Sequence, residues 1–129
     1  MDHILLGKTI NNIKVTADEE KLNFICEDGD HLAFTEAECC SSTWIENVEL
    51  PALGFPCKVL KVEELESEVI GEVEEYDHLQ KYGLKIVTDK GDIVIDYRNE
   101  SNGYYGGWLE FDKKVMLNDS IEWVEIKED

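Results

Sequence analysis

Apolar and polar residues alternate in two pairs of short segments, and each pair is joined by a tight turn. Residues 22–27 and 31–35 flank Asp28-Gly29, and residues 84–89 and 92–97 flank Lys90-Gly91. Alternation places one face of a strand against a core, and glycine supplies the positive φ that a two-residue turn needs. The pattern therefore predicts two β-hairpins.

Further segments have the composition and alternation of strands. They are residues 10–16, 44–50, 58–63, 107–111 and 121–127. A helix fits only around residues 76–82 or in the acidic stretch before them. We therefore expect a mainly β protein with at most one short helix.

Three blocks of sequence recur in the same order, which indicates an internal duplication. Leu6-Gly7 with Ile13-Lys14-Val15 recurs at residues 53–62, the first hairpin recurs as the second, and residues 45–50 resemble residues 121–126. The sequence distance between matching blocks increases along the chain, as it would if the second copy had gained insertions. We therefore predict pseudo-repeats at residues 6–50 and 53–126, with an acidic insertion within residues 63–83. The alternative is a chance likeness between β-rich acidic segments. A duplication predicts two antiparallel units packed as a sandwich or a partly open barrel, within a single domain of residues 1–129.

The composition adds a large negative charge to this picture. The 129 residues include 12 basic and 30 acidic side chains, a net charge of −18, and 43% are hydrophobic. A chain of this length can bury a conventional core. The cations are scattered along the chain, which disfavours direct binding to nucleic acid or to an anionic membrane. No apolar run has the length of a membrane span and the first residues lack signal-peptide features, so we expect a cytoplasmic protein.

Candidate metal ligands do not have the usual spacing. The four cysteines, at positions 26, 39, 40 and 57, fit reduced thiols in the cytoplasm. No cysteine or histidine pair has zinc-ligand spacing, so His31, Cys39, Cys40 and Cys57 form a weak candidate zinc set. Asp96, Asn99, Glu100 and Asp112 offer calcium ligands without a loop of known spacing. We predict no metal and no other cofactor.

Catalytic motifs give little support to an enzyme. The patterns GxSxG, GxxxxGK[ST] and HExxH are all missing. His31 or His78 paired with Cys39 or Cys40 remains a possible base and nucleophile, and a carboxylate pair for glycoside hydrolysis remains open. An unrecognised hydrolase is therefore one of the alternatives to a protein that only binds.

Two unusual motifs follow the two hairpins at matching places. Residues 39–46 are CCSSTWIE, and residues 98–108 are RNESNGYYGGW. Each combines small, turn-forming polar residues with an aromatic ring, as in a bend that a ring anchors. These motifs are folding elements, a binding surface, or both. The motif candidates are Cys39, Cys40, Ser41, Ser42, Trp44, Asn102 and Gly103, and the predicted contact residues are Tyr104, Tyr105 and Trp108 because rigid rings give much contact area for little entropy.

Acidic residues are concentrated in residues 63–77. This segment contains eight carboxylates and no cation, namely Glu63, Glu64, Glu66, Glu68, Glu72, Glu74, Glu75 and Asp77. Closely spaced carboxylates can compete with DNA for a basic groove, as in a DNA-mimicking inhibitor. The alternative is a solvated acidic loop that only aids solubility.

The two motifs, together with GKTI at residues 7–10, LPALG at 50–54 and IDYRN at 95–99, resemble a family of small uncharacterised proteins from bacteriophages and bacteria. The resemblance spans roughly residues 4 to 110. It implies no site residues, because the family has no established activity. It implies a setting, namely a phage accessory protein or a bacterial relative that works in the host cytoplasm.

These observations predict a non-enzymatic, phage-related protein that binds and inhibits a host protein, such as a defence or nucleic-acid-handling enzyme. Its acidic segment would steer the encounter and its aromatic rings would anchor it. The alternatives are a small-ligand-binding module with a pocket between the two motif loops, and an unrecognised hydrolase.

Overall fold

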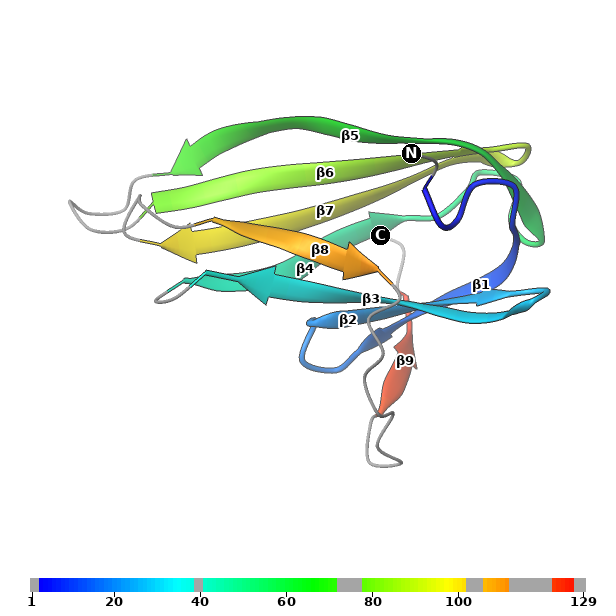
Figure 1. Ribbon diagram of the computed structural model, residues 1–129, viewed down its shortest axis with the longest axis horizontal. Helices are drawn as coiled ribbons and strands as arrows, with labels where there is room; N and C mark the ends of the chain where they lie inside the picture. Colours follow the sequence, from blue (N-terminus) through cyan, green and yellow to red (C-terminus); the bar gives the residue numbers. More distant parts are fainter. Residues whose placement is uncertain (1–2, 39–40, 72–77, 102–105, 112–121, 127–129) are drawn as a thin grey trace.

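The computed structural model describes residues 3–38, 41–71, 78–101, 106–111 and 122–126 (Figure 1). Within them, nine strands form one antiparallel sheet. The strands are β1 (Thr9–Thr16), β2 (Lys21–Cys26), β3 (Gly29–Ala37), β4 (Ser42–Glu49), β5 (Cys57–Gly71), β6 (His78–Thr88), β7 (Gly91–Ser101), β8 (Gly107–Phe111) and β9 (Trp123–Glu125). The described residues contain no helix, and hence none that could cross a membrane. The predicted mainly β antiparallel fold is confirmed.

The sheet is open rather than closed into a barrel. Its order is β4-β7-β6-β5-β1-β2-β3-β8, and β9 pairs with β1. This order has an internal symmetry in which β1, β2, β3 and β4 correspond to β5, β6, β7 and β8. If each strand is replaced by its counterpart, the result is the same order read from the other end. A duplication would produce this pseudo-twofold pattern, although the duplication itself stays a prediction. In this pattern β8 is the counterpart of β4. The internal sequence repeat had instead predicted residues 121–126 as the counterpart of residues 45–50.

Both predicted hairpins are present. Cys26 pairs with Gly29 in the first and Thr88 with Gly91 in the second, so each turn has two central residues. Gly29 has φ 127° and Gly91 has φ 120°. These are conformations that residues with a side chain rarely adopt, which explains why glycine occupies both positions.

The acidic segment is the main difference from the sequence-based expectation. Residues 78–82, where a helix was considered, belong to β6, and β5 continues through the acidic stretch to Gly71. Cross-strand pairing with β6 accounts for this, because Glu68 lies opposite Lys81 and Leu65 lies opposite Gly83. The described part of the predicted insertion therefore extends a hairpin instead of forming a loop or a helix. The rest of it, residues 72–77, lies outside the described residues.

The core lies between the two halves of the curled sheet (Figure 1). It is one cluster of buried side chains, and the fully buried ones include Leu5, Ile10, Ile13, Leu22, Phe24, Val59, Ile86, Ile93 and Ile95. The two ends of the strand order also approach each other. At these ends, β4 contacts both β3 and β8. β4 also contacts the turn between β1 and β2, where the Ile45 amide donates to the Glu19 carbonyl at 2.7 Å. This near closure brings the two sequence motifs together.

Candidate functional site

The two motifs meet at a packed junction. Thr43 of β4 lies opposite Asn99 of β7, and Asn99 Nδ2 donates to Thr43 Oγ1 at 3.0 Å. Asn99 is only 1% exposed. Gly107 of β8 lies against this pair, because a Cβ there would overlap the Thr43 hydroxyl and lie 2.8 Å from Asn99 Nδ2. We call this group the Thr43–Asn99–Gly107 junction, and its tight packing gives the second glycine of the YYGG sequence a structural role.

The bend before β4 satisfies its own polar groups. Ser41 Oγ donates to the Glu38 carbonyl at 2.7 Å, and the Glu38 amide donates to the Gly106 carbonyl at 3.0 Å. These bonds link the two motifs through their backbones. They match the bend that the polar composition predicted, although they leave open whether the same surface also binds a partner.

The motif tryptophans occupy equivalent places on β4 and β8. Trp44 Nε1 donates to Glu46 Oε2 at 2.8 Å, and Trp108 Nε1 donates to Glu110 Oε2 at 2.7 Å. Trp108 is 41% exposed, as a contact residue would be. The remaining motif candidates divide into exposed Ser42, half-buried Ser41, and Cys39, Cys40, Asn102, Gly103, Tyr104 and Tyr105, which lie outside the described residues.

The acidic segment forms an exposed strand edge. β1 pairs with β5 only at Cys57 and Lys58, and the Val59 amide and carbonyl bond to the N-terminal segment. From Leu60 onward, no strand of the described residues pairs with the outer side of β5. We call residues 63–69 of β5 the acidic edge.

Within the part of the chain that the structure describes, most side chains of the acidic edge have no ion-pair partner. Glu63 is the exception, because Lys61 and Lys85 lie 3.4 and 3.7 Å from its carboxylate. The exposed carboxylates of the edge are Glu64, Glu66 and Glu68, and Leu65 and Val69 expose 42% and 52% of their surface between them. The other predicted acidic candidates, Glu72, Glu74, Glu75 and Asp77, lie outside the described residues.

A cavity of about 480 Å³ lies between the N-terminal segment, β8 and the inner face of β5–β7. Val62, Leu84 and Leu109 give it apolar walls. Glu64 lies opposite Leu84 in the sheet register and brings a carboxylate to the cavity. Glu110 also borders the cavity, but its side chain lies on the opposite face of β8 from Leu109 and Phe111, where Trp108 Nε1 donates to its carboxylate. We call it the β5–β8 cavity. Sequence reasoning missed it, except for Glu64, because its lining comes from distant parts of the chain.

Two titratable groups of the β5–β8 cavity are neutral at pH 7. Burial lowers the pKa of His3 despite the opposing effect of Glu64, and His3 Nδ1 accepts a hydrogen bond from the Leu5 amide at 3.1 Å. The His3 ring also packs edge-on against Phe111, with 4.5 Å between ring centroids. Burial raises the pKa of Tyr97 to about 12, and nearby Glu64 adds to the effect. The charge of the cavity therefore comes from the Glu64 carboxylate.

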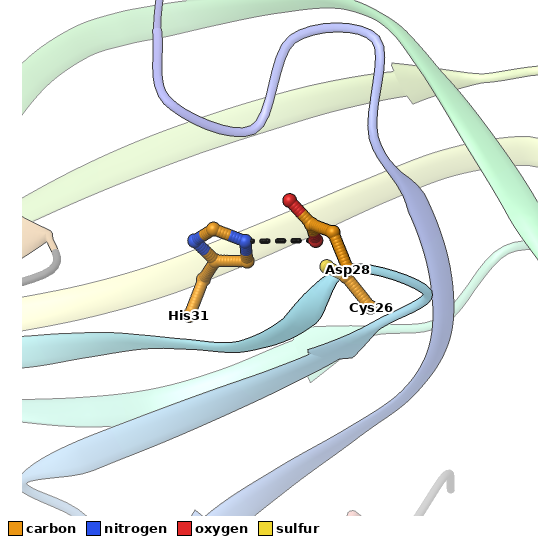
Figure 2. A group of neighbouring side chains, drawn as sticks. All are labelled: Cys26, Asp28 and His31. Carbon is orange, nitrogen blue, oxygen red and sulfur yellow. Dashed lines mark hydrogen bonds and ion pairs between the residues drawn. The ribbon is translucent and has the colours of Figure 1, made fainter.

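Three potential metal ligands gather at the first hairpin turn. Figure 2 shows His31 facing Asp28, with the Cys26 sulfur beside them. The ligand atoms of these residues lie within 4.8 Å of one another. However, His31 Nε2 is 3.0 Å from Asp28 Oδ1, and Lys8 Nζ is 2.5 Å from Asp28 Oδ2. A zinc ion would have to displace this lysine and remove the thiol proton. The group therefore acts as a polar clamp between the N-terminal segment and the hairpin.

Burial makes the described thiols unreactive, which is directly testable. Cys26 and Cys57 are 5% and 1% exposed, and burial raises the pKa of both thiols, that of Cys26 to about 11. Because the thiolate is the reacting form, we expect iodoacetamide at about pH 8 to alkylate both at least ~100-fold more slowly in the folded protein than in urea. Peptide mass spectrometry over time measures this. Rapid alkylation of folded Cys26 or Cys57 would instead show that these thiols are not buried as described. The predicted pairs of His31 or His78 with Cys39 or Cys40 are a separate matter, because both of those cysteines lie outside the described residues.

The candidate calcium ligands are not brought together. Asp96 pairs with Arg98 at 3.2 Å, whereas Asn99 is buried at the Thr43–Asn99–Gly107 junction. Residues at odd and even positions of a strand point to opposite faces, so Asp96 and Asn99 cannot share an ion. Asp112 lies outside the described residues.

Comparisons with known proteins place the chain in a family. Residues 3–111 match the family described as a domain of unknown function, DUF7448. The chain is also similar to "Uncharacterized protein L278" of Acanthamoeba polyphaga mimivirus, with 30% identity over 115 residues that cover 84% of this chain and 90% of that protein. No solved structure matches. The resemblance to an uncharacterised family is confirmed at this level, and an origin in bacteriophages or bacteria stays a prediction. The chain belongs to the DUF7448 family.

Proposed function

We propose that the protein acts by binding a partner protein, with an extended basic segment of the partner adding to the acidic edge of β5 as a further strand. One observation carries this proposal. β5 offers an exposed edge beyond Val59, and that edge combines Glu64, Glu66 and Glu68 with exposed apolar side chains. Strand addition gains affinity from main-chain hydrogen bonds and specificity from alternate side chains.

Charge selects the kind of partner. A β-bulge lies between Leu65 and Glu68, so Glu64, opposite Leu84, and Glu68, opposite Lys81, project to opposite faces of the strand. The edge therefore presents carboxylates on both faces and favours a segment rich in lysine or arginine. The net charge of −18 accelerates encounter with such a partner and opposes encounter with nucleic acid. A second copy of this chain is a poor occupant, because its glutamates would lie against those of the first.

The same chemistry gives a route to inhibition. Proteins that hold a nucleic-acid backbone do so with basic surfaces, and an acidic strand docked there would exclude the natural ligand. In the phage-related setting that the sequence resemblance implies, the partner is a host protein, such as a defence or nucleic-acid-handling enzyme. The site of action would be the host cytoplasm.

Charge reversal at the acidic edge tests the proposal. The probe is a seven-residue peptide of alternating lysine and valine. We expect it to bind and to slow amide hydrogen exchange along β5, with an affinity that falls as salt is raised. The double variant Glu66→Lys/Glu68→Lys should weaken binding by at least ~10-fold, because it places like charges opposite each other.

The matched control is Glu20→Lys/Glu27→Lys, which makes the same charge change at exposed positions away from β5. It should retain most of the affinity, and both double variants should keep the melting temperature of the parent protein. Equal losses in the two double variants would mean that only net charge matters. No protection along β5 would show that the edge does not accept a strand. Either result would refute the proposal.

Small-ligand binding is a second candidate function, and the β5–β8 cavity is the observation that favours it. The cavity differs from the pocket expected between the motif loops, whose tips at residues 39–40 and 102–105 lie outside the described residues.

A further inference from the structure

We propose that the β5–β8 cavity binds a small organic cation, with the charged amine near Glu64 and the apolar body against Val62, Leu84 and Leu109. This inference does not depend on strand addition at the acidic edge. It assigns a ligand class to a site formed by different side chains, with Glu64 as the one shared residue.

The size and walls of the cavity fit a compact ligand. Its volume of about 480 Å³ is within the range of small-molecule sites, which are mostly apolar with a few convergent polar groups. Val62, Leu84 and Leu109 lie on three different strands and give the open cavity an apolar wall. Phe111, fixed by its edge-on contact with His3, adds an aromatic wall.

The electrostatics favour a positive charge. Glu64 brings its carboxylate to the cavity, and no lysine or arginine among the described residues lines it. His3 adds no opposing charge at neutral pH, because burial keeps its imidazole neutral. An ammonium group would therefore gain from this carboxylate and from the aromatic rings, whereas an anion would be repelled.

Tyr97 supplies a further polar group at the cavity. The residue is only 8% exposed and lines the cavity, but its hydroxyl oxygen is not itself buried, so a ligand can reach it. Its ring is held in place by stacking on Tyr82, with 5.2 Å between centroids. A bound ligand with a polar group beside its amine would give this hydroxyl a partner.

A set of three probes with the same apolar body tests the charge preference. They are phenethylamine, 2-phenylethanol and 3-phenylpropanoate, and methyl NMR shifts of Val62, Leu84 and Leu109 report binding in the intact chain. We expect the amine to bind at least ~10-fold more tightly than the alcohol, and the acid to give no shifts at these methyls. Equal binding of amine and alcohol would overturn the proposal, as would amine shifts confined to other methyls or no binding at concentrations on the order of 10 mM.

Variants separate this site from the acidic edge. Glu64→Gln should weaken amine binding at least ~5-fold and leave alcohol binding unchanged, because only the charge is removed. Glu110→Gln is the matched control, because the Glu110 side chain points away from the cavity and glutamine can still accept the Trp108 hydrogen bond. Glu66→Lys/Glu68→Lys should weaken peptide binding while amine binding persists. Insensitivity of amine binding to Glu64→Gln would refute the site even if the amine binds.

Discussion

Gly107→Ala should destabilise the protein by about 3 kcal/mol, a large loss for a single methyl group. The new Cβ would overlap the Thr43 hydroxyl and lie 2.8 Å from Asn99 Nδ2 and 2.9 Å from the Glu36 carbonyl oxygen. None of these groups can retreat easily. Asn99 is buried and bonded to Thr43, and the Glu36 carbonyl belongs to the backbone of β3. Urea unfolding followed by tryptophan fluorescence measures the loss.

Gly106→Ala is the matched control, because it makes the same chemical change one residue earlier. The closest atom to its Cβ would be the Tyr82 hydroxyl oxygen at 3.2 Å, at the far end of a side chain that can shift slightly. We expect a loss of at most about 1 kcal/mol. Adding Thr43→Ala to Gly107→Ala should restore part of the stability by relieving the overlap, although Asn99 then lacks its partner. Equal free energies of unfolding for Gly107→Ala and Gly106→Ala would show that β8 does not pack against β4 and β7 as described.

The hairpins could be predicted from the sequence because their signals are local. Alternation and a turn glycine lie within about ten residues of each other, and both hairpins appear where they were expected. The acidic stretch had no such signal. Its glutamates are poor strand formers, and β5 continues through them because β6 supplies partners such as Lys81 opposite Glu68. Tertiary pairing therefore overrode local preference.

The candidate sites were predictable only in part. The composition of the motifs indicated a bend, and the hydrogen bonds of Ser41 are those of a bend. The junction itself depends on Thr43, Asn99 and Gly107, which three different strands bring together. The sequence signal for their proximity is ambiguous. The pattern Trp-x-Glu occurs at residues 44–46 of β4 and 108–110 of β8, but it also occurs at residues 123–125 of β9, so it does not by itself mark β4 and β8 as equivalent strands. No local signal marks the β5–β8 cavity, since the strand order alone places residues 3, 64 and 110 around it.

The equivalent turn glycines should respond differently to the same substitution. We expect Gly91→Val to cost about 3 kcal/mol and Gly29→Val about 1–2 kcal/mol. Both have positive φ, so a β-branched side chain is strained at either turn. A Cβ at Gly91 would also lie 2.8 Å from the Ala52 amide nitrogen, whereas a Cβ at Gly29 would have no atom within 4 Å.

The environment of the second turn explains why this contact matters. The Leu53 amide donates to the Lys90 carbonyl at 2.9 Å, so the turn is held against the segment between β4 and β5 and cannot move away from Ala52. At the first turn, the side chain would enter open space and only the backbone strain would remain. Thermal and urea unfolding of both variants, compared with the parent protein, give the two losses separately. A Gly29→Val loss equal to or greater than the Gly91→Val loss would mean that the second turn does not pack on Ala52, and that backbone strain alone sets the cost at both hairpins.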